Sequence, residues 1–399
     1  MRAARAILPL AAGAGALAAV AAAVAASRHA RITEHSPIRP PEGWSTAWTW
    51  GLIAGFALYV AGVLLLARRP APLAAVVALA AAIQLVPLAA PLLLSTDAYS
   101  YWDYARTRPV HHGNPYSDRP SLFPHDPAYE RMGKDWQGKP SVYGPAFTLA
   151  SETVAHESRR GAIRFFRVLA AAGALALVAA TALAARRRAF AAAFVGWNPL
   201  AALHFAGGGH NDVLMMAFVA GGLGLAARGR FRLEGAAWGA ALSIKLTVLV
   251  LLPLRLLAAR ERRRIAIGFA AVATAIAVVA SIAYGSGWLR VLSPVANQLH
   301  TPSSLGLAYW ASRLGFPQRY AVDGLLLVFA VVYVWLLREA WRGRARLGLT
   351  ACALLLATSW LQPWYAVWAL PLAAVEEDRL AQALALALSA YVLRDALPV

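Results

Sequence analysis

Long runs of apolar residues recur along the chain, separated by short polar or basic stretches. A helix of about 20 apolar residues crosses the roughly 30 Å hydrocarbon core of a bilayer. Several runs are shorter than that and would have to be tilted or enclosed by their neighbours. The pattern predicts an all-α polytopic transmembrane helix bundle of about 11 spans. The expected spans are residues 7–26, 50–67, 73–94, 163–185, 190–206, 213–227, 265–283, 321–337, 347–361, 364–375 and 380–397.

Composition supports this class. Hydrophobic residues make up 60% of the 399 positions and charged residues 14%, whereas soluble domains carry about 25% charged residues. Intrinsic disorder is excluded by the same hydrophobicity. The single cysteine, Cys352, excludes a disulfide framework and a thiolate metal cage. The net charge of +19 would suggest nucleic acid for a soluble chain; here we expect a lipid bilayer as partner and no nucleic acid.

The positions of the basic residues predict the topology, because cytoplasmic loops collect Lys and Arg. Placing all basic clusters inside puts the N-terminus in the cytoplasm of a multi-pass plasma-membrane protein. The clusters are residues 68–69, 186–188, 228–232, 260–264 and 338–346. The connections expected outside are residues 28–49, 95–160, 207–212, 284–320 and 362–363. The alternative for the first run is a cleaved signal peptide.

One segment does not alternate. Residues 233–259 lie between two basic clusters and are too short for two spans. We interpret them as a re-entrant hairpin of two half-helices with Lys245 near its tip, because irregular backbone is tolerated at membrane depth only inside protein or beside a cavity. The alternative is one long tilted helix. No internal repeat is visible, so residues 1–399 are expected to form a single transmembrane domain with one long exterior loop, 95–160.

The exterior loop begins with a segment rich in acids and aromatics, residues 95–104. Asp97 follows an apolar run directly, and a partly desolvated carboxylate is suited to act as a general base. The interleaved rings, among them Tyr99 and Tyr101, suit stacking on a sugar. An interfacial aromatic belt with a solvated aspartate is the alternative.

Two further exterior segments carry polar and aromatic residues. Asn114-Pro115-Tyr116 has the residue types of a tight turn, and Tyr143 leads the loop back to the membrane. A loop of this length is usually functional, although it could simply cap the bundle. The late segment Gln362-Pro363-Trp364-Tyr365 breaks a helix at its proline and either lines a site or marks the interface.

A glycine-rich segment, Gly207-Gly208-Gly209-His210-Asn211-Asp212, opens another helix. Three glycines permit close approach of a ligand or another chain, and a helix N-terminus favours anions. Asp212 alone could be a helix cap. A metal site is the weaker interpretation of a His and an Asp two positions apart. Lys245 is a costly intramembrane cation that either holds a lipid phosphate or extends to the cytoplasmic surface.

These segments resemble the GT-C superfamily of glycosyltransferases. Residues 97–104, 114–116 and 143–145 are similar to its first exterior loop. The runs GGGHNDVLM (207–215), ALSIK (241–245) and QPWY (362–365) resemble bacterial polyprenol-phosphate-mannose-dependent α-1,6-mannosyltransferases. The resemblance covers about residues 73–375.

The resemblance implies a membrane enzyme that moves a sugar from a polyprenyl-phosphate carrier to a cell-envelope glycan or glycolipid at the outer face. It implies inversion by a single displacement, with Asp97 as base. Many members carry two adjacent acids in this loop; here the second acid, Asp103, lies six positions on, so its role is open. We expect no cofactor beyond the donor substrate and no metal ligand. The residues expected to bind substrate are Tyr99, Tyr101, Asp103, Asn114, Tyr116, Tyr143, His210, Asn211, Asp212, Lys245, Gln362, Trp364 and Tyr365.

The chemistry is compatible with this implication. A phosphate leaves as a stable anion, so the reaction needs a base for the acceptor hydroxyl and positive groups for the phosphate rather than a general acid. Two alternatives are a lipid-sugar flippase or transporter that couples through Lys245 and Asp212, and a non-catalytic scaffold of the same shape. Arabinose and glucose are open alternatives to mannose.

Overall fold

Apolar runs fold as helices throughout the computed structural model, which describes residues 2–35, 42–291 and 301–398. No strand occurs in these ranges, so the predicted all-α class is confirmed. Segments 36–41 and 292–300, parts of two predicted exterior connections, lie outside the described residues. The α-helices of ten or more residues are α1 (Arg2–His29), α2 (Trp44–Arg68), α3 (Leu73–Leu85), α4 (Asp97–Thr107), α7 (Arg159–Ala184), α10 (Asp212–Ala226), α11 (Phe231–Leu242), α12 (Val248–Ala258), α13 (Arg262–Tyr284), α16 (Gln318–Trp341), α17 (Leu347–Ala357) and α19 (Arg379–Leu393).

Within these described ranges, five helices are long and apolar enough to cross a membrane, or six if one bent pair counts as a span. The predicted count of about 11 spans is therefore not confirmed. The remaining apolar runs form shorter helices such as α3, α10 and α17. The 3₁₀ turn Val86–Ala89 continues α3, and most residues of α17 are buried. A helix enclosed by protein does not need the full length of a lipid-facing span. The five spans are Ile7–His29, Trp44–Arg68, Arg159–Ala184, Arg262–Val291 and Gln318–Trp341.

The bent pair falls in the run expected as one span over 190–206. Helix α8 (Arg188–Gly196) is followed after a 56° bend by the segment Pro199–Gly207, which comprises α9 (Pro199–Ala202) and a π-helical turn, η4 (Leu203–Gly207). Pro199 has no N–H to continue the helix, and the Asn198 side chain caps the new one by accepting from the N–H groups of Leu200 and Ala201. The bend brings the glycine segment, residues 207–212, to the end of the bundle that lies against residues 95–160.

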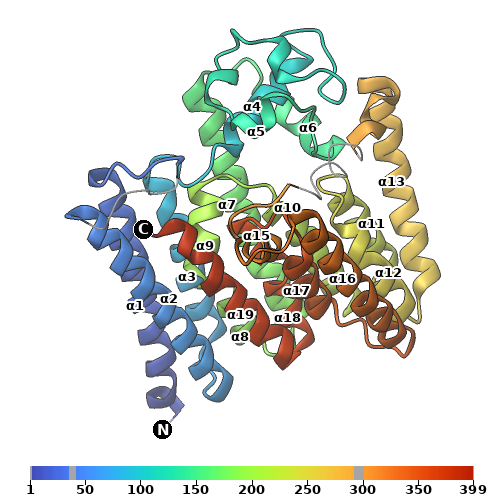
Figure 1. The fold of residues 1–399 in the computed structure, drawn as a ribbon. Coiled ribbons are helices and arrows are strands. Elements are labelled where there is room, and N and C mark those ends of the chain that lie inside the picture. Colours follow the sequence, from blue (N-terminus) through green and yellow to red (C-terminus); the bar gives the residue numbers. More distant parts are fainter. Residues whose placement is uncertain (1, 36–41, 292–300, 399) are drawn as a thin grey trace.

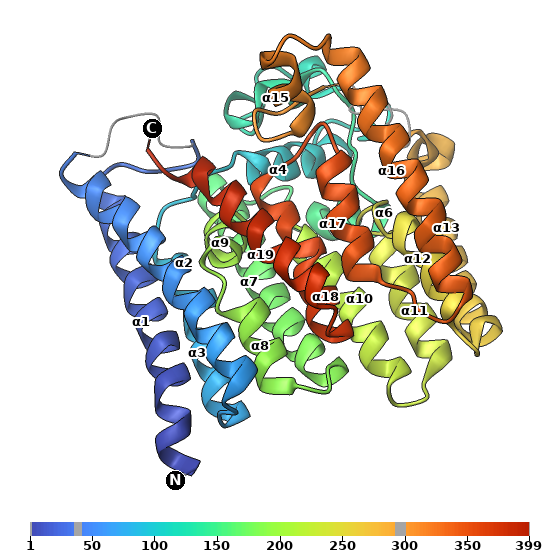
Figure 2. The same ribbon diagram turned by 60° about the horizontal axis from the view of Figure 1, so that its bottom comes forward.

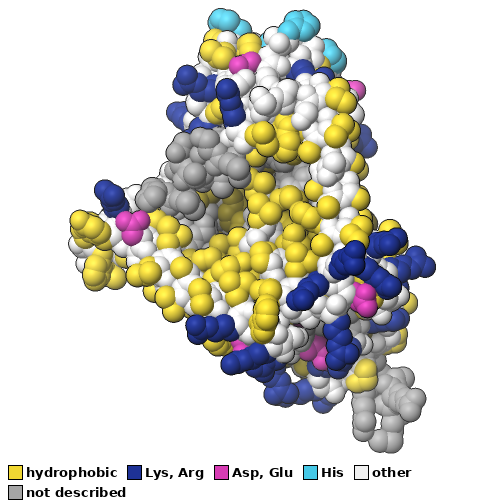
Figure 3. Space-filling model, turned by 90° about the vertical axis from the view of Figure 1, so that its right-hand side faces the viewer, with side chains coloured by type: hydrophobic (Ala, Val, Ile, Leu, Met, Phe, Trp, Pro, Cys, Tyr) yellow, Lys and Arg dark blue, Asp and Glu magenta, His cyan; other side chains and the backbone are white. Residues whose placement is uncertain are grey.

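The outermost helices present apolar side chains to their surroundings. On α16, Leu327, Val328 and Val331 are exposed, and on α13 Ile282 is exposed. Figure 3 shows hydrophobic side chains across the middle of one face, with Lys and Arg above and below them. Such a band is unfavourable in water and is the surface expected of helices that contact lipid.

The two ends of the bundle differ in chemistry. At one end, Arg187 donates to the carbonyls of Leu66 and Ala67, and Arg228 to that of Leu183, so three of the predicted basic clusters lie together. Figure 1 shows these turns at the lower end and a helical cap at the upper end. The separation agrees with the predicted sidedness; which end is cytoplasmic stays a prediction.

Residues 95–160 form this cap. It contains α4, α5 (Lys134–Gln137), α6 (Pro145–Glu152) and two short 3₁₀ turns. Charge pairs whose carboxylates are buried hold the cap elements together: Arg106 donates to both oxygens of Asp126, and the partly exposed Arg108 pairs with Glu152. The long exterior loop is thus an ordered helical lid rather than an irregular connection.

The segment 233–259 consists of the two short helices α11 and α12, which lie side by side in Figures 1 and 2. Lys245 occupies the turn between them, which faces the cap. The Gly144 N–H donates to the Ile244 carbonyl at 2.9 Å, and the Ala146 N–H to the Ser243 carbonyl at 3.1 Å. The cap therefore rests directly on the turn that carries Lys245. The re-entrant placement of this hairpin in a bilayer stays a prediction.

Gly144 tests this contact, because a Cβ there would overlap the Ser243 backbone. We expect Gly144→Ala to cost about 1–3 kcal/mol, typical of overpacking, and to accelerate hydrogen exchange in 95–160 and 241–248. Gly138→Ala is the matched control, because a Cβ at Gly138 meets nothing within 4 Å. Equal exchange in the two variants would show that the docking contact is not formed.

Candidate active site

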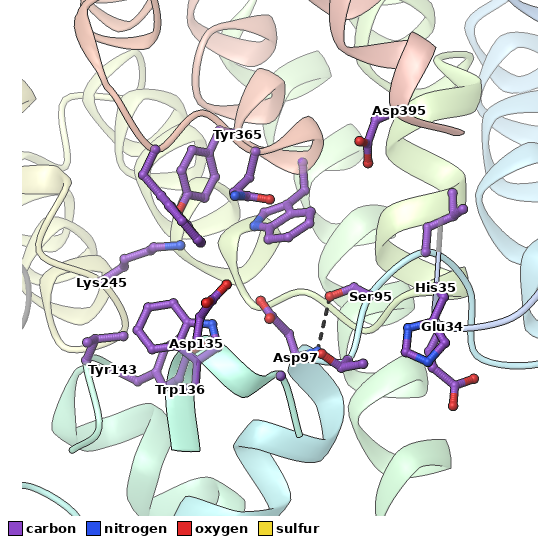
Figure 4. Close-up of a pocket in the computed structure, with 17 residues that line it drawn as sticks. Glu34, His35, Ser95, Asp97, Asp135, Trp136, Tyr143, Lys245, Tyr365 and Asp395 are labelled. Carbon is purple, nitrogen blue, oxygen red and sulfur yellow. Dashed lines mark hydrogen bonds between the residues drawn. The ribbon is translucent and has the colours of Figure 1, made fainter. Parts of the chain in front are cut away.

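A cavity of about 340 Å³ lies where the cap meets the end of the bundle. Connections that are distant in sequence contribute its walls: the segment after α1, the cap, the α11–α12 turn and the segment after α17. In Figure 4, Asp97 lies between Lys245 and Tyr143 on one side and Glu34 and His35 on the other. The lining residues are Glu34, His35, Leu94, Ser95, Thr96, Asp97, Gly133, Asp135, Trp136, Val142, Tyr143, Lys245, Trp360, Gln362, Trp364, Tyr365 and Asp395.

Asp97 is the first residue of α4 and points into the cavity. Its N–H donates to the Ser95 hydroxyl at 3.1 Å, which fixes the backbone entering the helix. The side chain is only 15% exposed, and its Oδ2 lies 3.3 Å from Nδ1 of the buried His210. A half-enclosed carboxylate with a free face is geometrically able to accept a proton from a bound molecule.

His210 forms the floor behind Asp97. Its ring stacks on Trp364 with centroids 3.5 Å apart. Its Nδ1 faces Asp97 without hydrogen-bond geometry, and neither its Nε2 nor the Asn211 amide has a hydrogen-bond partner among the described residues. Buried polar atoms are normally hydrogen-bonded, so this cluster of unpartnered donors and acceptors marks a place where polar groups are held for something other than fold stability.

The glycine segment puts His210 in place through close backbone contacts. Gly209 adopts φ +81°, which a larger residue rarely takes, and a Cβ at Gly208 would be 2.8 Å from the His204 carbonyl oxygen. The Arg167 guanidinium donates to the carbonyls of Ala206 and Pro87. The glycines are therefore required for close packing of the chain upon itself.

Lys245 and Asp212 form a buried ion pair at the cavity wall. Lys245 Nζ donates to Asp212 Oδ1 at 2.6 Å, and the Trp368 indole donates to the same oxygen at 2.7 Å. The ammonium also lies over the Tyr365 ring, 4.7 Å from its centroid. Asp212 has no exposed surface, whereas the Lys245 side chain is 17% exposed and reaches the cavity. The pair joins α10, the α11–α12 turn and the segment after α17.

Aromatic rings build the rest of the wall. Tyr365 stacks on Trp368 at 4.2 Å, and the edge of Tyr143 meets Tyr101 at 4.9 Å. Trp136 from the cap faces Trp360 across the cavity mouth. Flat apolar faces beside carboxylates are the arrangement that receives a polar ring with an apolar face, such as a sugar.

The candidates from sequence divide into three groups. Lining the cavity are Asp97, Tyr143, Lys245, Gln362, Trp364 and Tyr365, and directly behind it lie Tyr101, His210, Asn211 and Asp212. The remaining candidates do not line it. Tyr99 faces a neighbouring cavity. Asn114 donates to the Tyr284 carbonyl at the end of α13, and Tyr116 donates to the Tyr143 carbonyl within the cap.

Asp103 also lies away from the cavity, buried in the cap near Asp126. Six positions along a helix turn a side chain about 240° from Asp97, so the two acids cannot share one pocket. Burial, with the Asp126 charge as a smaller cause, raises the Asp103 pKa to about 7 against the opposing Arg106 charge. Asp103 Oδ2 has no partner among the described residues, consistent with a neutral carboxyl.

Several residues of the site were not found from sequence. Glu34 and His35 come from the connection after α1, Asp135 and Trp136 from the cap, and Trp368 from one helical turn beyond Trp364. Trp368 follows Tyr365 by three positions in the 3₁₀ helix Pro363–Trp368, where residues three apart share a face, but no sequence signal indicated a 3₁₀ helix there. Glu34 and His35 lie on irregular chain, and Asp135 and Trp136 lie in the four-residue helix α5, so no repeated spacing predicts their direction.

Fold and site together define a class: an all-helical membrane protein with an aromatic-walled acidic cavity at one end of its bundle. The profile of the family described as "Alpha-(1->6)-mannopyranosyltransferase, N-terminal domain" matches residues 8–261. The chain belongs to the alpha-(1->6)-mannopyranosyltransferase family. The match includes Asp97, the glycine segment and Lys245, and ends before Trp364.

A relative is "Alpha-(1->6)-mannopyranosyltransferase B" of Corynebacterium glutamicum, 34% identical over 113 residues. The matched region spans 27% of this chain and 19% of that relative. No solved structure matches the chain. The family assignment confirms the resemblance inferred from the motifs.

Removing one member of the Lys245–Asp212 pair should be costly, because it leaves a buried group uncompensated. We expect Asp212→Asn to destabilise the protein by about 3–5 kcal/mol. The double variant Asp212→Asn/Lys245→Gln should lose clearly less than the sum of the single losses, measured by thermal unfolding in detergent. Strictly additive losses would contradict the pairing.

The raised pKa of Asp103 predicts pH-dependent cap stability. An unfolded aspartate titrates near pH 4 and the folded one at about 7, so the folded cap keeps a proton that the unfolded chain has released. Stability should therefore fall as pH rises from about 4 through 7. Hydrogen exchange over 97–107, corrected for intrinsic rates, should show the fall in wild type and not in Asp103→Asn. A fall of equal size in both would contradict it.

Proposed function

We propose that the protein is a membrane glycosyltransferase that transfers mannose from a polyprenyl-phosphate carrier to a cell-envelope glycan or glycolipid acceptor. The family assignment supports the sugar, and the cavity supports the chemistry. The observation that carries the proposal is the position of Asp97. It is an enclosed carboxylate facing a cavity with aromatic walls, at the bundle end opposite the basic clusters.

In the proposed reaction Asp97 acts as general base. It accepts the proton of an acceptor hydroxyl while the hydroxyl oxygen attacks the anomeric carbon of the donor sugar. The bond from that carbon to the phosphate oxygen breaks, and polyprenyl phosphate leaves with the electron pair. One displacement from the opposite face inverts the configuration, and a general acid is unnecessary because the phosphate is a stable anion.

Lys245 supports the departing phosphate in this scheme. The Lys245 ammonium donates one hydrogen bond to Asp212, and the Lys245 side chain still lines the cavity. A charge held in place before the reaction stabilises the anion that develops in it. Lys245 and Asp97 both border the pocket drawn in Figure 4, so the proposed base and the proposed cation face the same space.

The bundle orientation completes the proposal. The basic clusters lie at the end away from the cavity, and such clusters favour the cytoplasm. With this sidedness the protein lies in the plasma membrane with its N-terminus inside and its cavity open to the exterior face. A carrier lipid would then stay in the bilayer while its sugar enters the cavity.

The flippase or transporter alternative gains no support from the described residues. Its coupling charges, Lys245 and Asp212, bond to each other at 2.6 Å. Glu234, the acid of α11, is likewise paired with Arg255 at 2.5 Å. Charges held in tight pairs do not form a relay of exchangeable sites across the membrane.

Asp97→Asn tests the base directly. The amide keeps the shape of the side chain but cannot accept the proton, so transfer from polyprenyl-phosphate mannose should fall by about 10²- to 10⁴-fold. The measurement is mannose incorporation into a lipid-extract acceptor by purified protein, with thermal unfolding recorded alongside.

Asp103→Asn is the matched control, a second aspartate of α4 that does not line the cavity. It should retain transfer within a few-fold of wild type at pH 7. If Asp97→Asn turns over like wild type, Asp97 is not the base. If no polyprenyl-phosphate sugar is used by the folded wild-type protein, the transferase proposal itself fails.

A further inference from the structure

A second cavity, of about 620 Å³, adjoins the first and has a different chemistry. The two share Glu34, and the chain segments 92–99 and 131–133 contribute to both. Five arginines line the second cavity against the single carboxylate of Glu34: Arg131, Arg159, Arg160, Arg164 and Arg167. Several guanidinium groups around one cavity are typical of sites that bind phosphate.

Three of these five arginines form no ion pair or hydrogen bond with another described residue. Arg167 donates to two backbone carbonyls, and Arg131 lies 3.9 Å from Glu34. Among the described residues, no carboxylate lies within 4.0 Å of the guanidinium groups of Arg159, Arg160 or Arg164, and no hydrogen bond from them is formed. Three like charges held together without counter-ions repel one another, which favours binding of an anion between them.

The location is unusual for basic residues. Helix α7 enters the bundle at Arg159, beside the cap and therefore at the end opposite the basic clusters. Arginine at that end runs against the distribution that sets membrane orientation. The rule that basic residues gather on the cytoplasmic side therefore does not explain these arginines, which indicates that they have a local function.

The remaining lining is apolar and leads toward lipid. Leu88, Pro91, Leu92, Ile163 and Val168 complete the cavity wall. Arg160, Arg164 and Val168 are spaced by four residues and share one face of α7. Val168 is 47% exposed on a helix long enough to cross a membrane. Along α7 the cavity wall therefore changes from arginine to apolar side chains, which matches the order of a lipid head group and its chains.

We propose that this arginine cavity binds the phosphate group of a membrane lipid, with the lipid chains along the apolar face of α7. The site is separate from the Asp97–Lys245 pocket and adjoins it through Glu34. It does not depend on sugar transfer, and it adds a lipid-binding site to the proposed function. The phosphate belongs either to a polyprenyl phosphate or to an anionic phospholipid of the bilayer.

The test uses the full chain in nanodiscs of neutral phosphatidylcholine and measures bound lipid by native mass spectrometry. The probes are polyprenyl phosphate, phosphatidylglycerol and inorganic phosphate, titrated separately. Arg160→Gln/Arg164→Gln removes two charges that bond to no other described group. Each basic residue near a membrane surface contributes a factor of about five to anionic lipid binding, so the double variant should bind at least about tenfold more weakly.

Arg186→Gln/Arg188→Gln is the matched control, because these exposed arginines lie at the other end of α7; it should bind like wild type. A loss confined to polyprenyl phosphate identifies the carrier as the ligand, and a loss confined to phosphatidylglycerol identifies the bilayer lipid. A loss for both shows that the cavity takes the phosphate group of either lipid. Unchanged binding of both lipids by the double variant overturns the proposal, as does inorganic phosphate binding as tightly as either lipid.

Sugar transfer by the wild-type protein separates this result from the proposed function. The lipid-binding measurement needs no sugar donor or acceptor, so a loss in Arg160→Gln/Arg164→Gln supports the arginine cavity even if the wild-type protein transfers no mannose. Transfer by the wild-type protein together with unchanged lipid binding in the double variant overturns the arginine site and leaves the proposed function standing.

Discussion

The buried pairing of Lys245 with Asp212 is the interaction on which the site depends. A carboxylate without exposed surface is tolerated only when its charge is compensated, and here an ammonium and an indole N–H converge on one of its oxygens. The three groups come from α10, the α11–α12 turn and the segment after α17, which are far apart in sequence. The cap rests on the same turn through Gly144, so one ion pair and one backbone contact hold Asp97 opposite Lys245.

Around this centre the fold separates two tasks. The long apolar helices α1, α2, α7, α13 and α16 provide the surface for lipid. The short and broken helices between them do not need to span the lipid, and their irregular backbone forms part of the site. The 56° bend after α8 is an example, since it delivers the glycine segment to the cavity at the position where a straight span would have continued. Irregular chain at this depth is tolerated because protein encloses it.

Much of this arrangement could be predicted from the sequence. Hydrophobic runs fixed the helical class, and the motifs around Asp97, His210, Lys245 and Trp364 do meet at one end of the bundle. What failed were inferences that depend on direction. Asp103, named as a substrate-binding candidate with an open role, is turned away from the cavity by α4, and Tyr99 on the same helix faces the arginine cavity. The span count of about 11 was not confirmed, because hydropathy does not distinguish a lipid-facing helix from one enclosed by protein. Glu34 and His35 lie on irregular chain and Asp135 in a helix of only four residues, so no periodicity signals their orientation.

The most direct measurement of the central claim is a cryo-EM structure in a lipid nanodisc with a non-transferable polyprenyl-phosphate mannose analogue. The account predicts sugar density in the cavity between Asp97 and the Lys245–Tyr365 wall, with the Asp97 carboxylate near the anomeric carbon's open face and the Lys245–Asp212 pair intact. Sugar bound at the arginine-rich turns of the opposite bundle end, or in any site beyond reach of Asp97, would contradict it.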